Sequence, residues 1–223
     1  MMQEIIGITG WKGHGKDTLA KMICEFSPSW NIVHFADPLK RMSGEIFGLS
    51  ESQLHDPILK EEEFSTPVRM DDYLDKMSLA TSLNLLPLGK VARCPRHVLQ
   101  FFGTDYVRSV CPSYWLDQFD SDISEMNYIV VPDLRFLNEA ELLKSKYYAF
   151  FVRVERLGVE KNTEHLSERE ISQIEVDLDL LTVTGNFSLQ EEVAEHLSFL
   201  DYSEASRYDR RVWEFLSHYY GGS

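Results

Sequence analysis

The sequence predicts an α/β fold in which a five-stranded parallel sheet carries helices on both faces. The first observation is that apolar segments of strand length alternate with segments of helical periodicity along the chain. The second is that the apolar segment 4–9 runs through a glycine-rich loop directly into a helix. The third is that segment 128–132 is almost entirely apolar, which is typical of an interior strand in a parallel sheet.

The predicted elements follow one another without an internal repeat. Strands are predicted over 4–9, 31–36, 128–132, 148–154 and 180–184. One helix is predicted directly after the glycine-rich loop and another after strand 128–132, ending near 146. Further helices are predicted over 37–47, 95–108 and 189–200. Prolines interrupt segment 50–95, in which only 70–86 has a helical pattern. This segment predicts a helical or irregular substrate-binding lobe inserted into a single domain, 1–223. The polar segment 157–170 predicts a short lid.

Composition restricts the classes of partner. With 22 basic and 36 acidic residues the net charge is −14, which argues against a surface for nucleic acid or an anionic membrane. No apolar stretch has the length of a bilayer span or the pattern of a signal peptide, so a cytoplasmic protein is expected. The three cysteines are widely spaced, which predicts reduced thiols rather than a disulfide framework or a zinc site.

The glycine-rich loop has the spacing of a phosphate-binding P-loop. It consists of Gly10, Trp11, Lys12, Gly13, His14, Gly15 and Lys16, followed by Asp17 and Thr18. Glycines let the backbone curl around an anion, and the helix that begins at Lys16 adds its positive dipole end. Lys16 would reach the outer phosphates of a nucleoside triphosphate. A glycine-rich turn with a lysine by chance is the alternative, but the strand before it and the helix after it favour the phosphate site.

Two positions predict a magnesium ion beside these phosphates. Asp17 stands where a serine or threonine usually follows the lysine, and a carboxylate there is repelled by phosphate unless a cation lies between them. Either Asp17 or Thr18 could hold Mg²⁺, directly or through water. Asp133 follows the apolar strand 128–132 in the Walker-B position, as a further Mg²⁺ ligand, and Arg135 would neutralise the transferring phosphoryl group. The alternative for this pair is a helix cap with a partnered arginine.

Further polar residues are candidates for substrate contacts. Asp37 and Lys40 lie at the start of a helix beside the P-loop, with Asp37 predicted at the N-cap. Among the basic residues of the inserted lobe, Arg69 is the candidate for a phosphate contact. Three side chains at four-residue intervals, Gln100, Thr104 and Arg108, share one face of the predicted helix 95–108 and suit a base edge and a phosphate. A cap, a solvated face and a surface arginine are the alternatives.

Six segments, in this order, resemble motifs of the bacteriophage deoxynucleoside monophosphate kinases: 10–18, 35–40, 99–108, 133–139, 165–168 and 186–191. The resemblance extends over nearly the whole chain. It implies an adenylate-kinase-like P-loop NTPase fold and transfer of the γ-phosphoryl group of ATP, with Mg²⁺, to a deoxynucleoside monophosphate. It also implies that Lys16, Asp133 and Arg135 are catalytic, that Arg156 lies near ATP or the lid, and that the monophosphate contacts Asp37, Lys40, Gln100 and Arg108.

Other classes remain open at this point. A P-loop kinase acting on dephospho-coenzyme A or phosphomevalonate would share the loop, and a non-catalytic nucleotide-binding protein would share the fold. The expected partners are small nucleotides. Aromatic residues in the tail are compatible with a homodimer, and a phage-encoded protein would act in the host cytoplasm.

Overall fold

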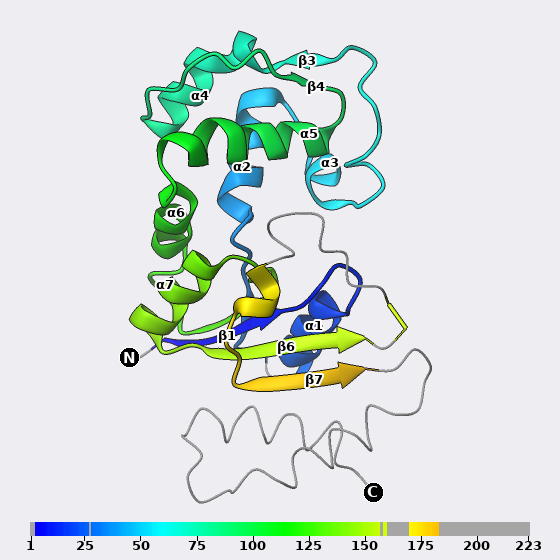
Figure 1. The fold of residues 1–223 in the computed structure, drawn as a ribbon, viewed down its shortest axis with the longest axis vertical. Helices are drawn as coiled ribbons and strands as arrows, with labels where there is room; N and C mark the ends of the chain where they lie inside the picture. The colour runs from blue at the N-terminus through cyan, green and yellow to red at the C-terminus, as the bar shows by residue number, and fades with distance from the viewer. Residues whose placement is uncertain (1–2, 27, 157, 160–169, 183–223) are drawn as a thin grey trace, which may run out of the picture. The chain divides into compact units, whose positions relative to one another are not determined.

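The computed structural model describes residues 3–26, 28–156, 158–159 and 170–182 (Figure 1). The chain divides into two compact units, one formed by Met1–His34 with Ile123–Ser223 and the other by Phe35–Asp122. Among the described residues, no helix has both the length and the apolar character that crossing a membrane requires. The predicted helix 189–200 and most of the predicted lid 157–170 lie outside the described residues.

The first unit contains the predicted five-stranded parallel sheet. Its strands lie in the order β2 (Asn31–Ile32), β5 (Tyr128–Val131), β1 (Glu4–Thr9), β6 (Phe150–Arg156) and β7 (Leu178–Thr182), and every neighbouring pair is parallel. The unit also contains the helices α1 (Lys16–Phe26) and α7 (Leu137–Tyr147) and the 3₁₀ turn η3 (Ile171–Gln173). The predicted fold class is confirmed.

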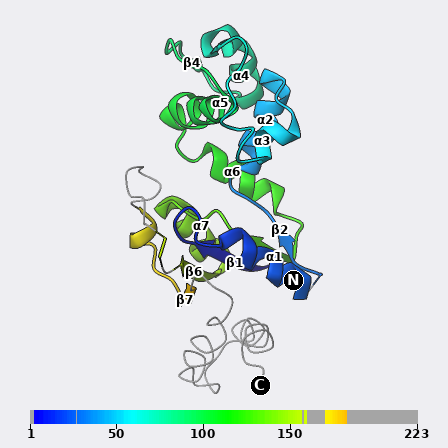
Figure 2. The same cartoon turned by 90° about the vertical axis from the view of Figure 1, so that its right-hand side faces the viewer.

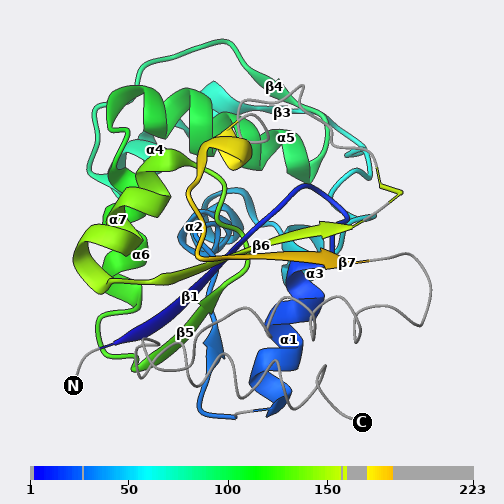
Figure 3. The same cartoon turned by 60° about the horizontal axis from the view of Figure 1, so that its bottom comes forward.

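Helices cover both faces of this sheet (Figure 3). Side chains alternate between the two faces of a strand, so Ile6 and Ile8 point to one face and Gly7 to the other. Ile6 and Ile8 belong to a buried cluster with Leu19 and Ile23 of α1. On the opposite face, a Cβ added to Gly7 would contact Phe151 and Leu134, and α7 packs against β1.

The strand order places a topological switch at β1. The chain goes from β1 to β2 and β5 on one side, and then crosses to β6 and β7 on the other. Ligands of open parallel sheets bind at the carboxyl ends of the strands where the order reverses. The carboxyl end of β1 is therefore the expected ligand position, and the P-loop begins there.

Four of the five strands differ from their predicted bounds, although β5 differs only in ending one residue earlier, at Val131. Strand β2 ends at Ile32 because the chain turns at Phe35 into the next helix, although the Val33 N–H still donates to the Val130 carbonyl. Strand β6 begins at Phe150, because Tyr148 adopts a left-handed conformation at the end of α7. Strand β7 is displaced by two residues and pairs from Leu178.

The second unit is mainly helical (Figure 2). Its elements are α2 (Asp37–Phe47), α3 (Glu51–His55), β3 (Val68–Arg69), η1 (Met70–Tyr73), α4 (Leu74–Thr81), β4 (Val91–Ala92), α5 (Pro95–Gln100), η2 (Phe101–Arg108) and α6 (Tyr114–Asp122). Aromatic and aliphatic side chains of α5, η2 and α6 form its core, including Val98, Phe102, Tyr106 and Trp115. The inserted segment 50–95 supplies α3, α4 and the short antiparallel pair of β3 and β4.

The predicted helix 95–108 is continuous, but its second half is a π-helix, η2. A Cβ at Gly103 would lie 2.6 Å from a Leu39 side-chain carbon, so the glycine allows α2 to approach η2 closely. The prediction that Asp37 caps α2 is wrong. The helix already includes Asp37, because Ala36 at the N-cap has helical dihedral angles, and the Asp37 carboxylate accepts a hydrogen bond from Lys40 Nζ at 3.1 Å.

Candidate functional site

The P-loop connects β1 to α1 and is built on three glycines with positive φ. These are Gly10 at 141°, Gly13 at 84° and Gly15 at 97°, conformations that side-chain-bearing residues rarely adopt. Gly10 lies against strand β6, since a Cβ added to it would meet the Val154 carbonyl oxygen at 2.3 Å. The loop then enters α1 at Lys16, so the N-terminus of an 11-residue helix lies at the end of the loop.

Lys16 is folded into this loop. Lys16 is 7% exposed, and its Nζ donates hydrogen bonds to the Gly10 carbonyl at 2.6 Å and the Trp11 carbonyl at 2.8 Å. The positive charge is therefore held within the loop by the backbone that is predicted to surround the phosphates. An arriving phosphate oxygen would find the ammonium group already in place.

Replacing Gly10 with alanine should destabilise the fold of the first unit. The new Cβ would collide with the Val154 backbone, and φ is unfavourable as well, so we expect a loss of about 2–5 kcal/mol. Thermal unfolding without nucleotide measures it. Gly15→Ala is the matched variant, because its φ is also positive but no atom lies within 4 Å of the added Cβ. We expect about 1–2 kcal/mol there; equal losses in both variants would contradict the predicted clash.

Asp17 lies on the first turn of α1 in a strongly charged environment. His34 lies beside it, with Nε2 3.9 Å from Oδ1, and is the main cause that lowers the pKa of the Asp17 carboxyl. The positive charges of Lys16 and Arg135 lower this pKa further, against an opposing effect of desolvation, although the Asp17 side chain is exposed. Asp17 therefore stays ionised near neutral pH. A role for His34 was not predicted, although a histidine near the carboxyl end of the predicted strand 31–36 was a usable signal.

Asp133 and Arg135 lie at the end of the strand next to β1. Gly7 of β1 pairs with Val131 of β5, so the residues after Val131 emerge beside the start of the P-loop. Both side chains are partly buried. Because the charge of Arg135 acts on Asp17, the structure brings the Arg135 side chain into the electrostatic surroundings of the P-loop, as the sequence analysis expected.

The buried carboxylate of Glu139 holds the backbone of this turn. Glu139 is 2% exposed, and its Oε2 accepts the Arg135 N–H at 3.0 Å and the Phe136 N–H at 3.1 Å. Such a bond from the first turn of a helix back to its N-terminus is a capping interaction. No role was predicted for Glu139, although an acidic residue in the first turn of a predicted helix could have indicated a cap.

Arg156 ends β6 on the other side of β1. Its backbone N–H donates to Nδ1 of His14 at 2.9 Å, and His14 is 1% exposed. The bond fixes the P-loop to the end of β6, while the Arg156 side chain is exposed.

The second unit carries the predicted substrate residues. Lys40 and Asp37 are paired in the first turn of α2, which the contact between Leu39 and Gly103 places next to η2. Gln100 and Thr104 are exposed and Arg108 is partly buried. Arg69 is exposed, with Nε 3.8 Å from Asp72 Oδ1. The structure thus brings the start of α2 and the middle of η2 together, and it leaves Arg69 on the surface of the inserted lobe.

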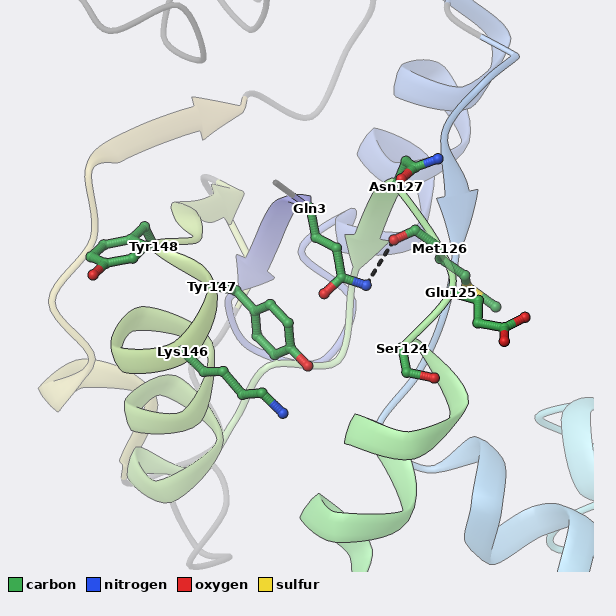
Figure 4. A pocket seen from close by; sticks show the side chains of 8 residues that line it. All are labelled: Gln3, Ser124, Glu125, Met126, Asn127, Lys146, Tyr147 and Tyr148. Carbon is green, nitrogen blue, oxygen red and sulfur yellow. Dashed lines mark hydrogen bonds between the residues drawn. The ribbon is translucent and has the colours of Figure 1, made fainter. Parts of the chain in front are cut away.

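A cavity of about 520 Å³ lies at the opposite, amino-terminal edge of the sheet (Figure 4). It is lined by Gln3 and by residues 124–127 and 146–148. The Gln3 amide points toward the 124–127 segment and donates to the carbonyls of Ile123 at 2.6 Å and Met126 at 2.7 Å. The Gln3 amide thereby holds the start of β1 in place. Because this cavity lies at the amino-terminal ends of the strands, it is distinct from the P-loop at their carboxyl ends.

A P-loop and an acidic residue on the adjacent strand end, at the switch point of a parallel sheet, define a protein of the P-loop nucleotide-binding class. No protein-family model matches the chain. A protein of Acanthamoeba polyphaga mimivirus, provisionally named deoxynucleotide monophosphate kinase, is 28% identical over 211 residues, covering 88% of this chain and 96% of that protein. The deoxynucleoside-5′-monophosphate kinase of Escherichia phage T5 is 27% identical over 181 residues, covering 64% of this chain and 72% of that protein.

The resemblance to the phage-type deoxynucleoside monophosphate kinases is therefore confirmed by two curated proteins. Among solved structures, TT1252 from Thermus thermophilus aligns with 90% of this chain and 100% of its own, with a TM-score of 0.41 and 13% identity.

Proposed function

We propose that this chain is a kinase that transfers the γ-phosphoryl group of ATP to deoxynucleoside 5′-monophosphates. The similarity to two proteins named for this substrate class carries the proposal. The bond between the γ-phosphorus and the β–γ bridging oxygen breaks, and a bond from the γ-phosphorus to an oxygen of the acceptor phosphate forms. ADP and a deoxynucleoside diphosphate are released. The acceptor oxygen is largely ionised near pH 7, so the chain needs no nucleophile of its own.

The residues then have distinct roles. The segment 10–18 binds the ATP phosphates, Lys16 and Arg135 stabilise the transferring group, and Arg156 lies near ATP or the segment 157–170, which acts as a lid. The monophosphate is bound by Asp37, Lys40, Arg69, Gln100, Thr104 and Arg108, with segment 50–95 as its lobe. Catalysis comes from positioning and charge neutralisation.

Mg²⁺ fits the acidic groups of the P-loop end. Within the part of the chain that the structure describes, no three His, Cys, Asp or Glu side chains are arranged to hold a metal by themselves. Asp17, Thr18 and Asp133 could hold Mg²⁺ together with phosphate oxygens and water, as is usual for this ion. When bound, it would neutralise phosphate charge. A carboxylate such as Asp17, whose lowered pKa keeps it ionised, is tolerable beside ATP only with such a cation.

Removal of Mg²⁺ should abolish transfer. Because the site would be completed by nucleotide phosphates, excess EDTA should reduce turnover to background without changing the melting temperature of the nucleotide-free protein. Direct separation of the nucleotide products and a thermal melt measure the two effects, and excess Mg²⁺ should restore activity. Full transfer in excess EDTA would contradict the metal proposal.

An acceptor panel tests the function. ADP release is measured with ATP, Mg²⁺ and, separately, dAMP, dGMP, dCMP, dTMP, the ribonucleotides, dephospho-coenzyme A and phosphomevalonate. We expect turnover with one or more deoxynucleotides, and ATP hydrolysis without acceptor should be far slower. Turnover with only one of the last two acceptors would support another small-molecule kinase. ATP binding without transfer to any acceptor would support a non-catalytic binding protein.

The expected partners are small nucleotides rather than nucleic acid or membrane. The expected location is the cytoplasm, or the host cytoplasm if a phage encodes the chain. Size-exclusion chromatography distinguishes a monomer from a homodimer.

A further inference from the structure

One carboxylate in the second unit, that of Asp71, receives hydrogen bonds from two separate segments. Asp71 lies in η1. Its Oδ1 accepts the Leu88 N–H at 3.0 Å and its Oδ2 accepts the Gly89 N–H at 2.9 Å. The Tyr106 hydroxyl of η2 donates to the same Oδ1 at 2.5 Å. Asp71 therefore joins the inserted lobe to the π-helix.

A second contact joins the same two segments. Lys90 Nζ lies 2.8 Å from Asp105 Oδ2 and 5.2 Å from the centre of the Phe101 ring. The Lys90 carbonyl also accepts the Met70 N–H at 3.0 Å, next to Asp71. These contacts hold the turn at 88–90, η1 and the π-helix η2 together.

At neutral pH the Tyr106 hydroxyl stays protonated and can donate, and the Asp71 carboxylate stays ionised and can accept. The Tyr106 hydroxyl lowers the pKa of the Asp71 carboxyl, and the Leu88 and Gly89 N–H groups act in the same direction. Burial, and then Asp71 itself, raise the pKa of Tyr106. The carboxylate is therefore ionised and the phenol protonated, which is the arrangement of a strong charge-assisted hydrogen bond.

The two joined segments carry substrate candidates that are far apart in sequence. Arg69 lies two residues before Asp71, at the end of β3. Gln100, Thr104 and Arg108 lie along α5 and η2 and are exposed or partly buried, whereas Tyr106 on the same helix is 1% exposed. π-Helices are rare and occur frequently at functional sites. The contact of Tyr106 with Asp71, on the buried side of η2, can therefore determine the position of the exposed η2 side chains relative to Arg69.

We propose that Asp71 and Tyr106 are positioning residues that hold the Arg69 strand and the π-helix η2 in the arrangement that binds the deoxynucleoside monophosphate. This inference rests on the proposed function. Neither residue touches the substrate in this proposal. Because they already hold β3 and η2 in place, less conformational entropy is lost when the acceptor binds. Their loss therefore weakens acceptor binding more than ATP binding.

Tyr106→Phe removes the donor and keeps the buried ring. We expect the KM of the preferred deoxynucleotide to rise at least about fivefold, as expected for losing a hydrogen bond to a charged group, while the KM of ATP changes less than about twofold. Tyr114→Phe is the matched control. Tyr114 lies in the same buried cluster, but its hydroxyl contacts Met42 Sδ at 3.8 Å and does not join the lobe to η2. It should leave both KM values unchanged.

Asp71→Asn gives a second variant, since it removes the charge without removing the side-chain shape. It should raise the acceptor KM as Tyr106→Phe does. If the wild type transfers phosphate but Tyr106→Phe and Asp71→Asn both keep its acceptor KM, or raise both KM values equally, the positioning role is wrong. If the wild type transfers phosphate to no deoxynucleotide, the proposed function fails and this inference fails with it.

Discussion

Replacing Lys16 with alanine should lower kcat by at least about a hundredfold, which is the scale for deleting one major charge stabiliser. The ammonium group lies inside the P-loop, held by the Gly10 and Trp11 carbonyls, where phosphates are proposed to bind. Alanine removes the charge and both loop contacts. Steady-state kinetics with saturating ATP and acceptor measures the loss, and near-normal turnover in the purified variant would contradict the assignment.

Lys21→Ala is the control for this variant. Lys21 is an exposed lysine of the same helix, five residues further along, and it has no role in the proposed site. Its loss tests whether removing any positive charge from α1 lowers turnover. We expect activity within about twofold of wild type, as for most exposed substitutions.

Arg135→Ala should have the second large effect. The guanidinium is proposed to neutralise charge that develops as the phosphoryl group moves, so we expect kcat to fall at least about a hundredfold. Because this interaction belongs to the transition state, the KM of ATP should change far less. Initial rates over a range of ATP concentrations separate the two quantities.

Arg135→Lys is the matched variant. It keeps the charge but not the planar fork of donors, so it should recover part of the lost turnover. A melting temperature equal to that of wild type in both variants would rule out unfolding as the cause. A large rise in the KM of ATP with unchanged kcat would instead make Arg135 a ground-state binding residue.

The sheet and the P-loop could be predicted because each is encoded locally. The apolar strand before Gly10 and the helix after Lys16 determine both elements, and the unbroken apolar strand at 128–131 indicates an interior position. The adjacency of β1, β5 and β6 is a tertiary property. It followed only from the general rules for parallel sheets and from the resemblance to known kinases.

The second unit was less predictable because its structure depends on contacts between distant segments. Two helices were missed. Helix α3 begins with Ser50 and Gln53 in a capping box, a local signal that could have been used, whereas α6 is stabilised by burying Trp115 and Phe119. The π-helical geometry of η2 had no sequence signal, and the contact between Asp71 and Tyr106 joins residues 35 positions apart.

The candidate site divides in the same way. Lys16, Asp133 and Arg135 could be named as candidates because motifs encode their type and spacing. His34 and Glu139 were missed because their importance comes from what they contact, namely the Asp17 carboxylate and the backbone of the Arg135 turn.

The most direct measurement follows the phosphoryl group itself. ATP labelled at the γ-phosphate is incubated with Mg²⁺ and each deoxynucleoside monophosphate, and the labelled products are separated and identified. We predict that the label appears in the deoxynucleoside diphosphate with the wild type and is at least about a hundredfold slower to appear with Lys16→Ala. Label released only as inorganic phosphate, or retained in ATP with every deoxynucleotide, would contradict the proposed kinase function.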